Sequence, residues 1–200
     1  MVACGFTQIP GVDYSADELY ASVCSYSLMR FLLSLATQKN YLLYQTDIQG
    51  AYLEADIDDE VYIPTMLDGK GNPPVDENGE PLVCLIKKGI YGLHQSGYAW
   101  AQCFKDFMLH DKEYAMGFTQ MTGEANMYRK AFMLDGKQEE IFIGQYVDDC
   151  LVVASSDAAR KWFTDRLSSR FPVNESSSGQ VSMNNPGLLL SMELLYDVVC

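Results

Sequence analysis

The stretch Ile141–Val153, IFIGQYVDDCLVV, sets two adjacent carboxylates, Asp148 and Asp149, between two apolar runs. Neighbouring residues of a regular strand point to opposite faces of a sheet, so two adjacent acids that serve one site belong at a turn. We therefore predict a β-hairpin whose turn presents both carboxylates at an open edge. Mg²⁺ binds carboxylate oxygens and keeps positions open for substrate phosphates, so this hairpin is a candidate metal site.

A two-metal site for phosphoryl transfer needs at least one further carboxylate from another strand. Asp47 follows the run Tyr41–Thr46, which has the composition of a strand, and it is the obvious third acid. An Asp-Asp turn taken alone is more often a solvated loop, and an Asp at the end of a strand can be a simple cap. The surrounding sequence has to decide between these interpretations.

The segment Leu43–Leu53, LYQTDIQGAYL, resembles the first catalytic motif of the reverse transcriptases of copia-type retrotransposons. Further stretches resemble motifs of that family in the same order: Val2–Gln8, Asp59–Ile63, Tyr91–Gln95 with Trp100 after it, Gly117–Tyr128 and Tyr146–Asp149. Several spaced motifs in one order are more specific than a single tetrapeptide. The resemblance covers nearly the whole chain, which is identified as a partial reverse transcriptase domain.

The resemblance implies an RNA-directed DNA polymerase that joins a deoxynucleotide to a primer 3′-hydroxyl with two metal ions, Mg²⁺ or Mn²⁺ as its substitute. Asp47, Asp148 and Asp149 would be the metal ligands and catalytic acids. Other residues match nucleotide-binding positions (Tyr52 and Gln95) and primer or template positions (Tyr146, Lys87 and Lys88). Tyr52 could equally be a core aromatic, and Gln95 the N-cap of the next helix.

The family's fold is an α+β palm with partial fingers, in which helices pack on one face of an antiparallel sheet. Residues 1–40 and 54–95 would be fingers-like and the remainder mostly palm. We expect the thumb and ribonuclease H regions to be absent. The expected partners are an RNA or DNA template with its primer, deoxynucleotides, and other parts of a transposon polyprotein.

Local patterns predict helices over residues 25–38, 96–110 and 157–170, with Ser25 and the run Ser155–Asp157 as caps. Strands are expected over 41–47 and 82–86, and after an acidic turn within 57–63. A second hairpin should pair residues 128–134 with 141–145 across Asp135-Gly136-Lys137. Residues 68–81 are rich in Gly and Pro and should form a loop, and residues 174–180 should be a Ser-rich linker.

Composition bounds these expectations. Two hundred residues with 48 % hydrophobic content suit one globular domain with a substantial core. No apolar run approaches the ~20 residues that span a bilayer, and no secretory signal is visible, so we expect no membrane association and a cytoplasmic or nuclear location. The six cysteines form no close pairs, which favours free thiols over zinc or disulfides.

Charge is the feature that fits the polymerase interpretation least. The chain carries 27 acidic against 14 basic residues, a net charge of −13. Nucleic-acid binding depends on Lys and Arg that neutralise phosphates. Where the family usually has basic residues, this chain has Cys4, Leu85, His94 and Tyr98, and Ser22 replaces a family proline.

Two other functions therefore compete with an active polymerase. The first is a catalytically inactive, truncated transposon remnant that folds but does not polymerise, because the acids are kept while cations are lost. The second is a small metal-dependent phosphohydrolase, which only the acids support.

Overall fold

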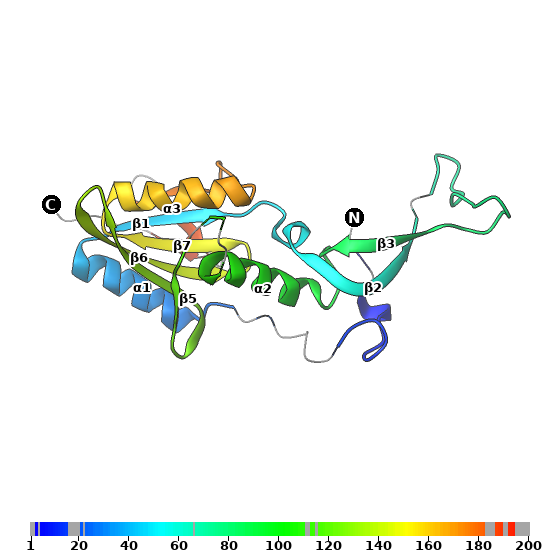
Figure 1. Ribbon diagram of the computed structural model, residues 1–200, viewed down its shortest axis with the longest axis horizontal. Helices are drawn as coiled ribbons and strands as arrows, with labels where there is room; N and C mark the ends of the chain where they lie inside the picture. Colours follow the sequence, from blue (N-terminus) through cyan, green and yellow to red (C-terminus); the bar gives the residue numbers. More distant parts are fainter. Residues whose placement is uncertain are drawn as a thin grey trace. The chain divides into compact units, whose positions relative to one another are not determined.

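The computed structural model describes residues 3, 5–15, 21, 23–65, 67–110, 113–114, 116–182, 187–189 and 192–194. The chain divides into two compact units, which are described separately (Figure 1). Unit 1 comprises residues 1–21 and 52–103, and unit 2 comprises residues 22–51 and 104–200. Cys4 and Ser22, two of the departures from the family pattern, lie outside the described residues.

A six-stranded antiparallel sheet forms the frame of unit 2, with the strand order β4-β5-β6-β7-β1-β8 (Figure 1). Its strands are β1 (Leu42–Asp47), β4 (Thr119–Met121), β5 (Glu124–Leu134), β6 (Lys137–Tyr146), β7 (Asp149–Ala154) and β8 (Gly179–Gln180). A separate small hairpin joins β9 (Gly187–Leu189) to β10 (Met192–Leu194). The predicted antiparallel α+β architecture is confirmed at this level.

The hairpin between β5 and β6 follows directly from its turn sequence. Asp135 and Gly136 both have positive φ, 49° and 76°, as a type I′ turn requires. The strands pair in register from Leu134 opposite Lys137 to Met127 opposite Gly144. This confirms the predicted hairpin and shows that its arms are longer than expected.

The three predicted helices are confirmed within one residue at each end: α1 (Tyr26–Lys39), α2 (Ser96–Leu109) and α3 (Asp157–Arg170). Ser25 caps α1 by accepting a hydrogen bond from the Leu28 N–H at 3.1 Å. Ser156 caps α3 by accepting one from the Ala159 N–H, also at 3.1 Å. Each cap satisfies a backbone donor that the first helical turn leaves without a partner.

The prediction that all helices cover one face of the sheet is wrong. Leu43, Val153 and Phe142 are cross-strand neighbours on one face, and they form a buried cluster with Leu28 and Leu32 of α1. Because side chains alternate along a strand, the next position of each strand faces the opposite side.

That opposite face carries α3 and the C-terminal part of α2. Tyr128 of β5 packs against Phe104 of α2 with ring centroids 5.9 Å apart, and Arg160 of α3 lies 5.0 Å from the ring of Tyr44. The sheet is therefore covered on both faces, which explains why β6 and β7 are buried almost throughout.

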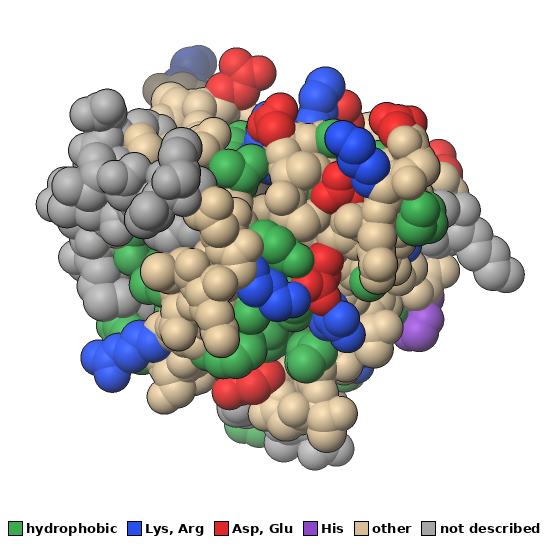
Figure 2. Space-filling view, turned by 90° about the vertical axis from the view of Figure 1, so that its left-hand side faces the viewer, with side chains coloured by type: hydrophobic (Ala, Val, Ile, Leu, Met, Phe, Trp, Pro, Cys, Tyr) green, Lys and Arg blue, Asp and Glu red, His purple; other side chains and the backbone are tan. Residues whose placement is uncertain are grey.

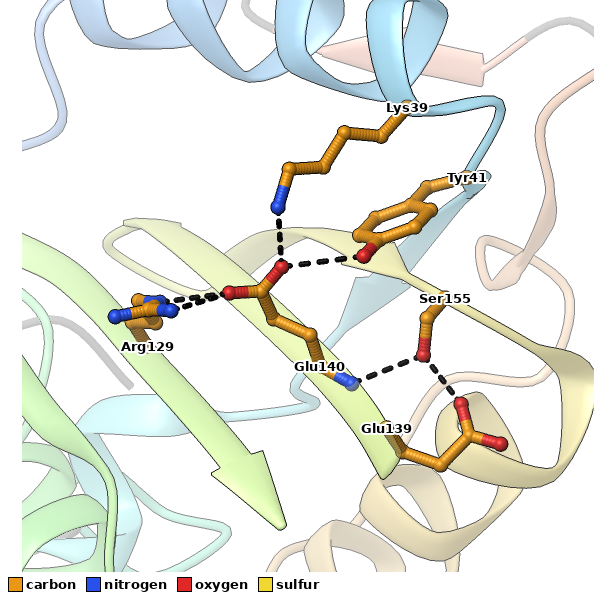
Figure 3. Close-up of polar contacts among 6 residues, drawn as sticks. All are labelled: Lys39, Tyr41, Arg129, Glu139, Glu140 and Ser155. Carbon is orange, nitrogen blue, oxygen red and sulfur yellow. Dashed lines mark hydrogen bonds and ion pairs between the residues drawn. The ribbon is translucent and has the colours of Figure 1, made fainter. Parts of the chain in front are cut away.

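Glu140 is a buried acid of this sheet with a complete set of partners (Figure 3). Its carboxylate accepts from Lys39 Nζ at 2.5 Å, from the Tyr41 hydroxyl at 3.1 Å, and from two nitrogens of Arg129 at 2.6 and 2.8 Å. Its own N–H donates to the Ser155 hydroxyl at 2.9 Å. Burial would raise the pKa of Glu140, but the bonds from Lys39 and Arg129 outweigh it and hold this pKa below its usual value.

Unit 1 is built around the antiparallel hairpin of β2 (Asp56–Pro64) and β3 (Val83–Lys88). A 3₁₀ helix, η3 (Ala51–Glu54), precedes β2, and another, η1 (Gly5–Thr7), lies near the N-terminus. The acidic segment expected to be a turn belongs to β2 instead, where the pairing is irregular between Asp56 and Val61. The described part of residues 68–81 forms the predicted loop.

Gly92 is required by close packing inside unit 1. Its φ is +96°, and a Cβ at this position would lie 2.1 Å from the carbonyl oxygen of Ala3. We expect Gly92→Ala to lower the free energy of unfolding by about 3 kcal/mol, from backbone strain and the clash together. Urea unfolding would measure this. Gly79→Ala is the control, because Gly79 also has positive φ but an added Cβ would meet nothing within 4 Å. Equal effects of the two changes would contradict the packing argument.

The cysteines that the structure describes, Cys24, Cys84, Cys103 and Cys150, carry free thiols. Within the described ranges, none of the helices combines the length and the hydrophobicity that crossing a bilayer requires.

Candidate metal and catalytic site

Three acids lie together at one end of the unit 2 sheet. β6 and β7 are joined by the two residues Val147 and Asp148, and β1 runs antiparallel to β7. Asp47, the last residue of β1, stands directly opposite Asp149, the first residue of β7. The N–H of Ile48 donates to the carbonyl of Asp148 at 2.9 Å, which ties the turn to the end of β1. The predicted hairpin and its placement beside Asp47 are confirmed; the catalytic role of the acids stays a prediction.

Val147 holds the turn in a strained conformation. Its φ is 54°, and Asp148 has no positive φ, a combination that matches a type II′ turn. Glycine is favoured at the first central position of such turns, and a β-branched residue there is a conformational outlier. The strain coincides with the two acids, as strained backbone often does at functional sites.

Val147→Gly should raise the free energy of unfolding by about 1 kcal/mol. Relief of about 1–3 kcal/mol of strain exceeds the roughly 1 kcal/mol of chain entropy that glycine loses on folding. Asp135→Gly provides the matched control, because Asp135 also has positive φ but Asp tolerates this conformation. Thermal unfolding of both variants tests the point; a loss of stability in Val147→Gly would show that the turn is not strained.

Two amide side chains contact the acids. Nε2 of Gln45 donates to Oδ1 of Asp149 at 3.2 Å. Nδ2 of Asn174 donates to Oδ2 of Asp47 at 3.0 Å. Neither amide was among the predicted site residues. Gln45 lies two positions before Asp47 on the same face of β1, a strand periodicity that could have revealed it.

Crowding of the acids changes their protonation. Burial raises the pKa of Asp149 to about 6; the hydrogen bond from Gln45 opposes this, and repulsion from Asp148 and Asp47 adds to it. Burial also raises the pKa of Asp148, as does repulsion from Asp47, against hydrogen bonds from the backbone N–H groups of Asp148 and Asp149. Acids with raised pKa values grouped in this way are typical of functional sites, where a cation would relieve the repulsion.

The chemistry of these groups suits a hard cation, because all three side chains offer carboxylate oxygens. Within the described residues, however, no three His, Cys, Asp or Glu side chains converge closely enough to hold a metal ion. Asp47 and Asp149 are instead hydrogen-bonded to the two amides. Tyr146, opposite Asp149 across β6 and β7, is half-buried against the core under α1.

The remaining predicted residues, Tyr52, Gln95, Lys87 and Lys88, belong to unit 1. Tyr52 lies in η3 with its ring 4.8 Å from that of Tyr91. Lys87 is exposed on β3, and Lys88 pairs with Asp56 at 2.8 Å. An exposed pair of this kind contributes at most about 1 kcal/mol and leaves Lys88 able to exchange partners.

Gln95 is buried and fully engaged within unit 1. Its Oε1 accepts from Gln8 Nε2 at 3.0 Å, and its Nε2 donates to the Asp13 carbonyl at 3.1 Å and to Asp59 at 3.4 Å. It also lies at the edge of a cavity lined by three acids, Asp56, Asp58 and Asp59. A contact from the Nε2 of Gln95 to a nucleotide would have to replace one of these bonds, whereas its Oε1 can accept a second hydrogen bond.

The family described as reverse transcriptase (RNA-dependent DNA polymerase) matches residues 1–182. The chain belongs to this reverse transcriptase family. The resemblance to copia-type retrotransposon enzymes is confirmed by transposon Pol polyproteins from three organisms.

The reverse transcriptase domain is 30 % identical over 177 residues to the Retrovirus-related Pol polyprotein from transposon RE2 of Arabidopsis thaliana, covering 88 % of the chain and 11 % of that protein. It is 28 % identical over 195 residues to the Transposon Ty1-GR1 Gag-Pol polyprotein of Saccharomyces cerevisiae, covering 98 % and 10 %. It is 26 % identical over 182 residues to the Retrovirus-related Pol polyprotein from transposon TNT 1-94 of Nicotiana tabacum, covering 90 % and 12 %. The chain thus spans about a tenth of the length of these relatives.

Proposed function

We propose that this chain is the polymerising part of a copia-type reverse transcriptase, which joins deoxynucleotides to a primer 3′-hydroxyl on an RNA or DNA template. The observation that carries the proposal is the two-residue hairpin that sets Asp148 and Asp149 beside Asp47 in a chain of this family. Asp47, Asp148 and Asp149 would hold Mg²⁺, or Mn²⁺ in its place. Bound metal would supply positive charge to the attacking and leaving oxygens.

The chain's own residues would prepare the site. The three acids concentrate negative charge in a partly buried position. Ionisation is unfavourable there, and the pKa values of Asp148 and Asp149 are therefore raised. Tyr146 is assigned to the primer end, because it is paired with Asp149 directly beside the turn of the hairpin. Tyr52 and Gln95 are assigned to the incoming nucleotide, and Lys87 and Lys88 to the template or primer, on the family resemblance.

We assign unit 2 to the palm and unit 1 to the fingers. This places residues 22–40 with the palm rather than the fingers, because α1 packs on the sheet that carries the acids. Residues 54–95 stay with the fingers. Other segments of a transposon polyprotein, such as a thumb and a ribonuclease H, would complete the enzyme.

A catalytically silent remnant is the second candidate, and the charge distribution favours it. Lys39 and Arg129 are both committed to Glu140, and Lys88 is paired with Asp56. On the face shown in Figure 2, Lys and Arg side chains lie singly among Asp and Glu side chains. With a net charge of −13, such a chain would bind a phosphate backbone weakly at moderate salt.

Primer extension separates the two candidates. The folded chain is incubated with an RNA template, a DNA primer and deoxynucleotides, in Mg²⁺ and then in Mn²⁺, at 20 mM and at ~150 mM salt. We expect incorporation that is stronger at low salt, because the contacts of Lys and Arg with phosphates weaken as the salt concentration rises. Absence of incorporation under all four conditions, from protein shown to be folded, would establish the remnant instead.

A further inference from the structure

A segment after α3 is fastened to the end of β1 that carries Asp47. We call residues 172–178 the strap. The N–H of Gln49 donates to the Pro172 carbonyl at 2.8 Å, and the N–H of Asn174 donates to the Asp47 carbonyl at 2.9 Å. The N–H of Asp47 donates to the Ser178 hydroxyl at 3.0 Å. The backbone of Asp47 is therefore held from both sides by the strap.

The side chain of Asn174 is itself oriented by the strap. Its Oδ1 accepts from the hydroxyl of Ser176 at 2.7 Å, and its Nδ2 donates to the hydroxyl of Ser177 at 2.8 Å. The other hydrogen of Nδ2 is directed to Oδ2 of Asp47, at 3.0 Å. The run of serines, which the sequence suggested was only a linker, thus fixes the amide that reaches the first acid.

Gln45 plays the corresponding part for the hairpin. Only 6 % of this residue is exposed, and its Nε2 donates to Oδ1 of the Asp149 carboxylate at 3.2 Å. A buried amide kept at this position is costly unless its hydrogen bonds are made.

We propose that Gln45 and Asn174 are positioning residues that hold Asp149 and Asp47 in the orientation that binds divalent metal. This rests on the proposed function. Each amide engages one oxygen of its carboxylate, and a carboxylate has about four acceptor sites, so capacity for a metal remains. A Lys or Arg at either position would neutralise the acid, whereas an amide orients it and leaves its charge in place.

Mn²⁺ binding tests the inference without reference to turnover. Free Mn²⁺ is titrated by electron paramagnetic resonance against the intact chain, Gln45→Met, Asn174→Ala and the acid variant Asp148→Asn/Asp149→Asn. Gln120→Met is the matched control, because its Nε2 donates to the Ala125 carbonyl at 2.6 Å near the far edge strand of the same sheet. Thermal unfolding without metal is recorded for every variant.

We expect Gln45→Met and Asn174→Ala to weaken Mn²⁺ binding by about 10–100-fold, the usual effect of losing a group that orients a metal ligand. Gln120→Met should leave it unchanged. A purely structural role would lower the melting temperature and leave the Mn²⁺ affinity of the folded chain unaltered, which would overturn the inference. Tighter binding would also overturn it, since the amides would then compete with metal.

The same titrations distinguish a failure of the proposed function from a failure of the positioning role alone. If the intact chain binds no Mn²⁺, or if Asp148→Asn/Asp149→Asn binds it equally well, the acids are not a metal site and both proposals are overturned. If the acid variant loses Mn²⁺ while both amide variants retain it, the positioning role alone is overturned.

Discussion

Asp148→Asn/Asp149→Asn should abolish nucleotide incorporation and, without metal, make the folded chain more stable. The loss of activity is expected to be about 10³-fold or more, because removing two metal-binding charges should cost at least as much as removing one donor to a transition-state oxyanion. Asn has nearly the shape of Asp and can still accept the hydrogen bond from Gln45. The change therefore removes charge and disturbs the packing little.

The gain in stability follows from the sign of the pKa shift. Burial raises the pKa of Asp149 from its ordinary 3.8 to about 6, so the ionised form is less favourable in the folded than in the unfolded chain. For a fully buried group a shift of this size would cost about 3 kcal/mol wherever the group is ionised in both states; Asp149 is only half-buried, and solvent screening reduces the cost to about 2 kcal/mol. The variant should recover about 2 kcal/mol of this at pH 7.5. The stability difference between the variant and the unmodified chain should shrink as the pH falls from about 6 towards 4. In this range Asp149 is protonated in the folded chain while it is still ionised in the unfolded chain.

Urea unfolding in EDTA at pH 7.5 and at pH 4.5 measures the stability gain at the higher pH and its decrease at the lower pH. Added Mg²⁺ should stabilise the unmodified chain and not the variant, because only the former binds metal in its folded state. A variant that is inactive but less stable at pH 7.5 would mean that the carboxylates serve the fold, which would contradict a site built for a cation. Asp135→Asn, in the turn at the other end of β6, controls for the removal of one charge.

Much of unit 2 could be predicted because its signals are local. Asp135-Gly136 specifies its turn through positive φ, and Ser25 and Ser156 mark the first turns of α1 and α3 through single hydrogen bonds. The adjacent Asp148 and Asp149 could likewise be placed at a turn, since a regular strand would separate them.

The parts that could not be predicted depend on contacts distant in sequence. Packing between distant residues, such as Leu32 and Val153 in one buried cluster, decides which face of the sheet a helix covers. Helical periodicity does not predict this choice. Asn174 is 127 residues from Asp47, and its role depends on a strap whose composition resembles any flexible linker. β8 is only two residues long and pairs with β1 at Tyr44 and Gln45, so no periodicity could reveal it.

Lys39→Ala/Arg129→Ala should cause a large loss of stability in unit 2. Of the carboxylate's partners in the described part of the chain, the two substitutions would leave the buried Glu140 with the Tyr41 hydroxyl alone (Figure 3). Removing the partners of a buried charge typically costs about 3–5 kcal/mol. We expect about 3 kcal/mol, at the lower end, because Lys39 and Arg129 are themselves partly exposed. Urea unfolding at pH 7.5 would measure the loss.

The triple variant that adds Glu140→Gln shows whether the loss comes from an unpaired charge. A neutral amide costs less to bury, so the triple variant should be more stable than the double variant at pH 7.5, although it has lost one more native group.

The pH dependence of the contribution of Glu140 to stability should also reverse between the unmodified chain and the double variant. In the unmodified chain the pKa of Glu140 is lowered, so its contribution is present above the ordinary value of 4.5 and is lost as the pH falls further. In the double variant burial raises this pKa and is opposed by the hydrogen bond from Tyr41 without those from Lys39 and Arg129, so acidification from neutral pH should stabilise the double variant relative to the triple. A triple variant as unstable as the double at every pH would mean that Lys39 and Arg129 stabilise the sheet through packing on Phe142 rather than through Glu140.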